Sequence, residues 1–338
     1  MNITAFTSYH KGQLSTAANG RRPLKIATSM GMLEFLAGIP THDTLRMIHD
    51  NLLLARAVEV FLKTASAVSL YRLREAQQHF VQRQTRQPRI FFKANASKLV
   101  GGVPRISKYN AWSFIDLITS GPTVVELPRN MVGVVNDMWF RVVEDIGMTG
   151  RDSGQGGKYL ILPPDHRGDI PRGYFILRPR TNSVGVFVRP TVARLSSCFM
   201  KFRAGELKIY PLFPRKESSL DRSESELIDG SLLAIKELTP YDDRFFADLN
   251  QLLQKEPFGS LDKEKRALFA SIGLMKGKLF RPTIRMQKML GDAVAIGHVT
   301  LHVMARNPQL FCANRIPVDT RGVVNRNNRP CLIEGGEK

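Results

Sequence analysis

A row of charged and aromatic side chains is the part of this sequence best suited to chemistry. Asp137, Trp139, Arg141 and Asp145 lie in or just after the apolar stretch Val132–Val143. An extended strand places odd-numbered residues on one face. An indole beside charged groups suits a sugar ring or a planar anion. We therefore expect these four residues to line a ligand site, with Trp139 at least partly buried, or to form a solvated face with cross-strand ion pairs.

Two arginines on a neighbouring segment extend this candidate site. Arg178 and Arg180 directly follow the β-branched and aromatic run Tyr174–Leu177. A guanidinium group binds carboxylate or phosphate with two parallel hydrogen bonds, although it can equally pair with the acidic residues of the row. The pattern predicts a non-catalytic protein that binds a small anionic or sugar-like molecule, or a structural protein.

A glycine-rich run, Asp152–Lys158, superficially resembles a phosphate-binding loop. It lacks the spacing of such loops, and no Ser or Thr follows Lys158. The strand expected next, Lys158–Leu162, stands where a helix N-terminus would be needed to receive the anion. We expect a tight glycine turn before a strand.

No residue pattern identifies a reaction or a metal site. His298 and His302 share a helix face, but no general base lies between them and no third ligand is apparent. No Ser or Cys stands in a nucleophile elbow. We therefore expect no metal and no cofactor, and leave the catalytic residues unassigned. An enzyme of unknown reaction, with its pocket on the β-rich part of the chain, remains the main alternative.

The net charge of +19 indicates anionic partners but no specific nucleic-acid site. The 49 basic residues of the 338 are spread along the chain, without the clustered element that a recognition surface needs. A non-specific nucleic-acid binder is therefore a further alternative. We expect weak binding to duplex DNA that is largely lost at about 150 mM salt. A titration that finds tight, sequence-dependent binding at that salt would contradict this expectation.

The elements that must position these residues follow from periodicity. Apolar residues recur every three or four positions from Leu45 to Leu62, which predicts an amphipathic helix beginning near Thr41. A second helix is expected over Ala67–Phe80, with Arg72 and Arg74 outward. From residue 88, short runs of β-branched and aromatic residues are separated by turn residues, which predicts β-strands. The expected strands are Arg89–Lys93, Trp112–Ile118, Thr123–Leu127, Val132–Val143, Lys158–Leu162, Tyr174–Leu177 and Gly185–Arg189.

Helical periodicity returns after Pro240 and ends at Pro308. The predicted fold class is α+β: an antiparallel β-sandwich-like domain with N-terminal helices and a C-terminal helical segment. The expected organisation is a disordered tail (1–23), a domain over 24–215 with helices in 41–82 and strands in 88–215, a linker (216–239), a helical segment (240–305) and an irregular tail (306–338).

Nothing in the sequence predicts a membrane span, since no run of about 18 apolar residues occurs. The first 22 residues contain no apolar core of a signal peptide, so the chain as written would be cytoplasmic. The three cysteines have no metal-type spacing.

Four stretches of the chain carry a family resemblance. They run from Thr28 to Leu62, Trp112 to Pro164, Pro171 to Pro190 and Asp242 to Gly297, and include the signature D-x-G-x-G-G-K-Y-L-x-x-P-P. In order and spacing they resemble a bacterial cell-envelope family, the domain of unknown function 1254. The resemblance implies an envelope or periplasmic location and no general reaction.

The resemblance also shows where this chain departs from the family. Family members usually continue into a second sandwich, the domain of unknown function 1214, and nothing after Ala305 is similar to it. An acidic position of a short family motif is not recognisable in Ile106–Trp112. We expect a truncated form that exposes apolar surface on residues 240–305 and forms homo-oligomers or dissolves poorly.

Overall fold

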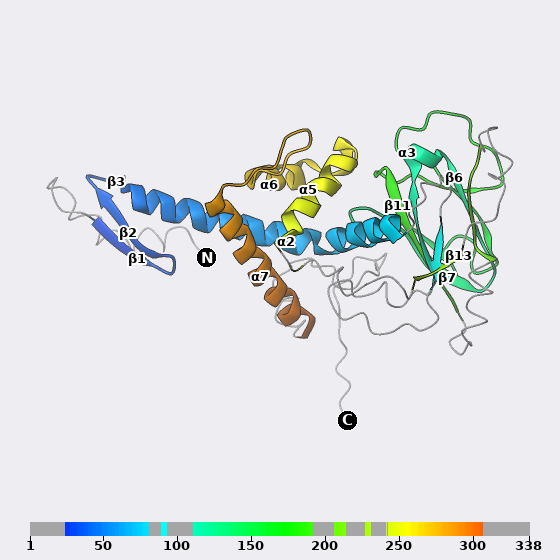
Figure 1. The fold of residues 1–338 in the computed structure, drawn as a ribbon, viewed down its shortest axis with the longest axis horizontal. Helices are drawn as coiled ribbons and strands as arrows, with labels where there is room; N and C mark the ends of the chain where they lie inside the picture. The colour runs from blue at the N-terminus through cyan, green and yellow to red at the C-terminus, as the bar shows by residue number, and fades with distance from the viewer. Residues whose placement is uncertain are drawn as a thin grey trace, which may run out of the picture.

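The chain folds into a long helix with a small sheet at one end, a β-domain at the other, and further helices packed along its side (Figure 1). The computed structural model describes residues 24–80, 89–92, 111–191, 206–213, 227–230, 241 and 243–306. Helices and mostly antiparallel sheets occupy separate parts of the chain, which confirms the α+β class.

Helix α2 (His42–Phe80) is one continuous helix of 39 residues, so the prediction of two helices was wrong. The segment between them, Lys63–Ser66, contains neither Pro nor Gly to end a helix. Its polar Thr64 donates its hydroxyl to Val60 O at 2.7 Å, which satisfies the side chain inside the helix. At about 1.5 Å per residue the helix is roughly 58 Å long, and it reaches from the small sheet to the β-domain.

The small sheet before α2 was not predicted. Strands β1 (Leu24–Thr28), β2 (Gly31–Leu36) and β3 (Ile39–Pro40) pair antiparallel. Thr44 ties the sheet to the helix, since its Oγ1 accepts from Glu34 N at 2.8 Å and donates to Glu34 O at 3.1 Å. The sequence signal was Ala37-Gly38, where both residues adopt a positive φ in the turn between β2 and β3.

The β-domain consists of two sheets packed face to face. One has the order β13-β4-β5-β11-β7-β8 and the other β10-β9-β6-β12 among the described residues. The pairs β9–β10 and β4–β13 are parallel and the others antiparallel. The bounds of the first sheet are β4 (Ile90–Phe92), β5 (Ala111–Asp116), β7 (Met131–Asp137), β8 (Val142–Gly147), β11 (Ser183–Pro190) and β13 (Leu227–Asp229). Those of the second are β6 (Thr123–Leu127), β9 (Gly157–Ile161), β10 (Phe175–Leu177) and β12 (Lys208–Pro211).

Buried side chains from both sheets form one apolar cluster between them. Val135 and Val186 come from the first sheet, and Val125 and Ile161 from the second. Burying such side chains stabilises the fold by about 1.5–3 kcal/mol each. The short helix α3 (Leu117–Ser120) connects β5 to β6 and so links the two layers.

The predicted strand Val132–Val143 is two strands. β7 ends at Asp137, residues 138–141 turn, and β8 begins at Val142. The Asp137 carboxylate causes the turn, because its Oδ1 accepts from the backbone N–H of both Trp139 (3.0 Å) and Arg141 (2.9 Å). The expected face of odd-numbered residues on one strand is therefore wrong, although Trp139 is buried as expected.

The helical segment after residue 240 packs along α2, from Asp50, which pairs with Arg285, to Arg72, which pairs with Asp248. It comprises α5 (Phe245–Lys255), the 3-10 turn η6 (Phe258–Ser260), α6 (Lys263–Ser271) and α7 (Ile284–Arg306). Phe245 and Phe269 join Phe61 of α2 in a shared core. Gly297 lets α7 cross α2 closely, since a Cβ there would lie 2.2 Å from the Phe61 ring.

Part of the expected apolar surface over residues 240–305 is exposed: the exposed fractions of Phe258, Leu279, Ile284, Ile296, Val299 and Val303 lie between 38% and 86%. The other residues on which the expectation was based are buried or half-buried. They are Phe245, Phe246, Leu249, Leu252, Leu268, Phe269, Met286 and Met289. No described helix combines the length and apolar character needed to cross a membrane.

Several predicted segments fall partly or wholly outside the described residues. The tail 1–23 and residues 307–338 lie outside them, as does the linker 216–239 apart from residues 227–230. Those four residues include strand β13, which pairs with β4.

Candidate functional site

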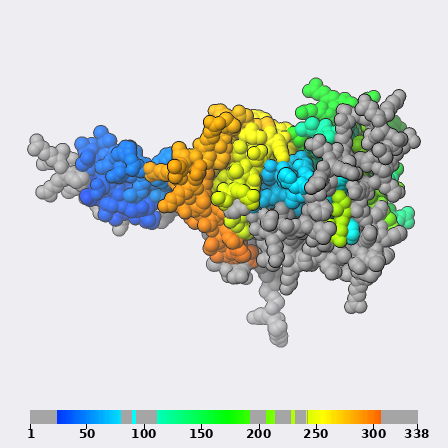
Figure 2. Space-filling view, viewed as in Figure 1, coloured from blue at the N-terminus to red at the C-terminus, as the bar shows by residue number. Residues whose placement is uncertain are grey.

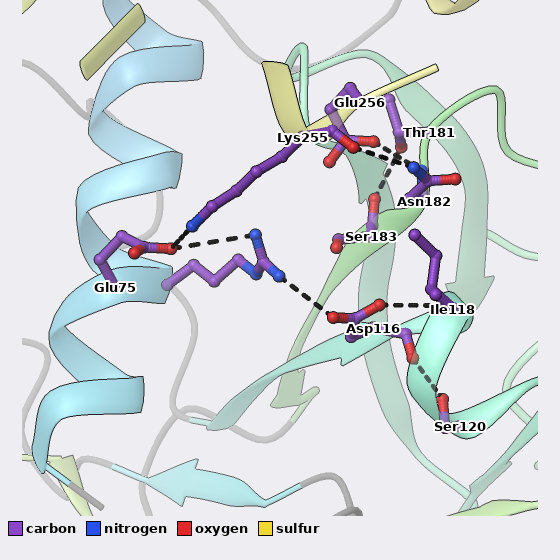
Figure 3. A network of polar contacts seen from close by, with 10 residues as sticks. Glu75, Asp116, Ile118, Ser120, Thr181, Asn182, Ser183, Lys255 and Glu256 are labelled. Carbon is purple, nitrogen blue, oxygen red and sulfur yellow. Dashed lines mark hydrogen bonds and ion pairs between the residues drawn. The ribbon is translucent and has the colours of Figure 1, made fainter. Parts of the chain in front are cut away.

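A buried polar network lies where α2, the end of α5 and the β-domain meet (Figure 3). Arg74 of α2 and Glu256, which follows α5, are only 5% and 1% exposed. Glu256 is the extended C-cap residue of α5, and Pro257 after it cannot continue the helix. Asp116 ends β5 and Asn182 precedes β11, so four distant segments converge here.

Direct contacts join the helices to the β-domain. Glu256 Oε2 accepts a hydrogen bond from Asn182 N at 2.5 Å, and Asn182 Nδ2 donates to Lys255 O at 2.9 Å. Arg74 Nη2 donates to Asp116 Oδ2 at 3.4 Å. Lys255 Nζ lies 2.8 Å from Glu75 Oε1, which bridges α5 and α2. Figure 3 shows these links running from the helix to the sheet.

Two charged groups of this network keep unused hydrogen-bonding capacity. Arg74 Nη1 and Glu256 Oε1 are buried and have no hydrogen-bond partner among the described residues. Leaving such a group unsatisfied costs about 1–3 kcal/mol, and more when it is charged. Buried polar groups of this kind mark places where a water or a ligand completes the network.

The surroundings of Glu256 favour its neutral, protonated form. Burial raises its pKa to about 7, the Asn182 N–H and the Arg74 charge oppose this rise, and the charges of Asp116 and Asp137 add to it. Glu256 can therefore be either protonated or ionised near neutral pH. Its free oxygen can donate a hydrogen bond in the first state and accept one in the second.

We expect the stability of the protein to decrease as the pH rises from about 4.5 to about 7, because of Glu256. In this window the folded protein holds a proton that the unfolded chain has released, so the free energy of unfolding falls with pH. Relative to Glu256→Gln, the wild type should lose on the order of 3 kcal/mol across the window. Urea unfolding of both proteins at several pH values measures the difference.

The comparison with Glu256→Gln reports on Glu256 together with its coupling to Asp137. Burial also raises the pKa of Asp137, which is present in both proteins and whose charge acts on Glu256. Glu264→Gln, at an exposed position of α6, should keep the wild-type pH profile. Parallel profiles for wild type and Glu256→Gln would contradict the assignment.

The structure brings together the predicted residues Asp137, Trp139 and Arg141. Their contacts, called the joint below, connect the turn after β7 to the helical segment. Arg141 Nε donates to Asp137 Oδ2 at 2.6 Å, and Arg141 Nη2 donates to Ser260 O at 2.7 Å. Trp139 Nε1 donates to Ser260 Oγ at 2.9 Å, and the indole ring packs against Phe269 of α6. These bonds use the polar groups to fasten the turn after β7 to the helical segment.

Asp145, Arg178 and Arg180 lie outside the turn at residues 138–141, so the predicted grouping is divided. Asp145 lies on β8, half-buried and opposite Val134. Arg178 and Arg180 are exposed, and neither is among the described contacts of Asp137. The turn in the middle of the row is the reason, since it ends the alternation on which the grouping depended.

The glycine-rich run is a structural turn, as expected. Gly154 and Gly156 have φ values of 75° and 78°, a conformation that glycine adopts without strain. Asp152 Oδ1 accepts from Gly147 N at 2.7 Å and from the Tyr159 hydroxyl, and its Oδ2 accepts from Gly156 N at 3.1 Å. The run therefore ties two loops to β9.

The histidine pair lies on α7 as expected. His298 stacks on Tyr241 with ring centroids 3.7 Å apart, and His302 is exposed. Within the described part of the chain, no group of three or more His, Cys, Asp or Glu side chains is arranged to hold a metal ion.

The residues of the buried network were missed by sequence reasoning. Arg72 and Arg74 were expected to point outward, yet both are buried, and Arg72 Nε pairs with Asp248 Oδ2 at 2.6 Å. A usable signal was present: residues 65–71 contain no charged side chain, which indicates a stretch of helix that is buried on most sides. Arginines directly after such a stretch need buried acidic partners.

Comparison with known proteins supports the family resemblance and the fold. Residues 108–200 match the family described as "Protein of unknown function (DUF1254)". The crystal structure of the VPA0106 protein from Vibrio parahaemolyticus is similar, with a TM-score of 0.50 and 15% sequence identity over 75% of this chain. This chain spans 60% of that one, and the likeness concerns the fold.

No curated protein matches the sequence. The strands β5 to β11, with the Asp152 turn and the Asp116 end of the buried network, lie within the matched residues. The family similarity of this chain rests on residues 108–200, and the family is one of unknown function.

Proposed function

We propose that this protein is a non-catalytic binding protein whose ligand is a small, neutral, sugar-like molecule held by Arg74 and Glu256. The observation that carries the proposal is the pair of buried atoms, Arg74 Nη1 and Glu256 Oε1, that have no hydrogen-bond partner among the described residues. Arg74 Nη1 lies 3.9 Å from Glu75 Oε1, an ion pair beyond hydrogen-bond distance. Arg74 supplies a donor, and Glu256 supplies a donor or an acceptor. Each hydroxyl of a sugar both donates and accepts, so neighbouring hydroxyls match this pair.

The charge of the network favours a neutral ligand over an anionic one. Three carboxylates, Glu75, Asp116 and Glu256, accompany two cations, Arg74 and Lys255. Asp137 adds negative potential at Glu256. A bound anion would face like charges, which costs free energy in a buried setting, whereas a hydroxyl-bearing ligand adds no charge.

Part of the network is open to solvent, which supports access for a ligand. The side chains of Asp116 and Lys255 are 36% and 38% exposed, whereas Arg74 lies deeper at 7%. Asp116 also caps α3 by accepting from Ile118 N at 3.1 Å, which holds the carboxylate in place. A ligand that enters beside these two residues would replace the solvent of the outer groups and reach the unpaired atoms.

A thermal-shift screen of sugars, polyols, carboxylates and phosphates tests this proposal. A ligand present at about 100 times its Kd raises the free energy of unfolding by about 2.7 kcal/mol. We expect sugars or polyols to raise the melting midpoint, and Arg74→Met to abolish that rise. Arg56→Met, at an exposed position of the same helix, is the matched control and should keep it. The proposal fails if no sugar or polyol shifts the midpoint, or if Arg74→Met retains the full shift.

An enzyme is the second candidate, favoured by the pKa of Glu256 near 7. A carboxyl group with that pKa can serve as a general acid or base at neutral pH. With a sugar found in the screen, Glu256→Gln would retain binding and lose turnover if the protein is an enzyme. Unchanged substrate after prolonged incubation with the wild type would favour the binding protein.

A further inference from the structure

The first part of the described chain forms an arm that projects from the rest of the molecule. The arm comprises residues 24–56, which are β1 to β3 and the beginning of α2. Figure 2 shows this blue region extending beyond the helical segment, and Figure 1 shows the small sheet at its far end. The arm is thus a separate surface, remote from the Arg74–Glu256 network.

The arm lacks a core of its own. In residues 24–56, all of which the structure describes, Thr44 alone is buried. A small sheet gains independent stability from burying a hydrophobic face or packing on a helix, and little of this arm is buried. Large apolar side chains of the arm are exposed instead: Met30, Met32, Leu36, Ile39, Leu45, Ile48 and Leu52.

Three of these side chains form a stripe on α2. Leu45, Ile48 and Leu52 are spaced by three and four residues, so they share one face, and they are 53%, 38% and 49% exposed. Asp50 lies two residues from both Ile48 and Leu52, about 200° around the helix. Its ion pair with Arg285 shows that α7 contacts the opposite side of α2.

The charge of the arm indicates what covers the stripe. Lys25, Arg46 and Arg56 balance Glu34, Asp43 and Asp50, whereas the whole chain carries +19. Two copies of so basic a chain repel each other except where the contacting surfaces are balanced. A nucleic acid or an anionic membrane would instead favour a basic surface. The occupant best matched to the arm is therefore a second copy of it.

We propose that two copies of this chain form a dimer by packing their arms together along Leu45, Ile48 and Leu52. A twofold axis near Ile48 sets Leu45 of one copy against Leu52 of the other, which is the self-complementary contact that such symmetry requires. The exposed side chains of β2 and β3 enlarge the apolar contact.

Sedimentation equilibrium on the full chain tests the dimer. We expect the wild type to have twice the monomer mass, and the Ile48→Arg and Leu52→Arg double variant to have the monomer mass. Both positions are partly exposed, so the variant should keep its fold, which circular dichroism checks. Ile118→Arg, at an exposed position of the β-domain, is the matched control and should remain dimeric.

Crosslinking locates the contact. With Cys198, Cys312 and Cys331 replaced by serine, Ile48→Cys should form a disulfide-linked dimer under mild oxidation, whereas Met148→Cys on the β-domain should not. A monomeric wild type at submillimolar concentration overturns the proposal, as does a double variant that remains dimeric. Co-flotation of a monomeric wild type with vesicles of phosphatidylcholine and phosphatidylglycerol would assign the stripe to a membrane and also overturn it.

Discussion

Replacing Asp152 with alanine is expected to lower the free energy of unfolding of the β-domain by about 3 kcal/mol. The carboxylate accepts hydrogen bonds from Gly147 N, Gly156 N and the Tyr159 hydroxyl, and Asp152 is buried. Its removal leaves three donors without their acceptor. Tyr159 is itself fully buried, so water cannot replace the lost bond without opening the sandwich.

Urea unfolding followed by tryptophan fluorescence measures this effect, because Trp112 lies on β5 inside the same domain. Asp169→Ala, at an exposed aspartate, is the control and should change the midpoint little. Asp152→Asn keeps an acceptor and should fall between the two. An Asp152→Ala midpoint equal to that of the control would show that the turn does not depend on its carboxylate.

Replacing Trp139 with alanine is expected to cost about 4 kcal/mol and to loosen the helical segment from the β-domain. The indole ring packs against Phe269 of α6, and its N–H donates to Ser260 in the 3-10 turn η6. Alanine removes the ring and leaves a cavity at the contact between two parts of the chain. The helices share one apolar cluster with Trp112, Val134 and Phe187 of the first sheet, whereas the cluster between the two sheets is separate. Loosening should therefore begin at the contact between the helices and the first sheet and precede complete unfolding.

Limited proteolysis and urea unfolding together test this prediction. We expect Trp139→Ala to be cut between α5 and α6 at low protease concentration, where the wild type resists. Trp139→Phe keeps an aromatic ring against Phe269 and loses one hydrogen bond, so it should cost only about 1 kcal/mol. If the alanine and phenylalanine variants behave alike, the ring packing does not hold the joint.

Short runs of β-branched and aromatic residues between turn residues could be predicted as strands from the sequence, because both features are local. The runs Thr123–Leu127 and Tyr174–Leu177 correspond to β6 and β10. Val132–Val143 could not be divided correctly, since the turn inside it depends on the Asp137 side chain bonding backbone N–H groups ahead of it. The small sheet at residues 24–40 was missed because its strands are short and only half-buried.

Local patterns determined the α+β class, the helices of the C-terminal segment and the structural role of the Asp152 turn, because each depends on residues near one another in the sequence. The tertiary structure decided which charged residues are buried. Arg74 and Asp116 are separated by 42 positions, and Asn182 and Glu256 by 74. Desolvation and the pKa of Glu256 arise only when these segments meet, because burial is a property of the packed surroundings and not of the residue.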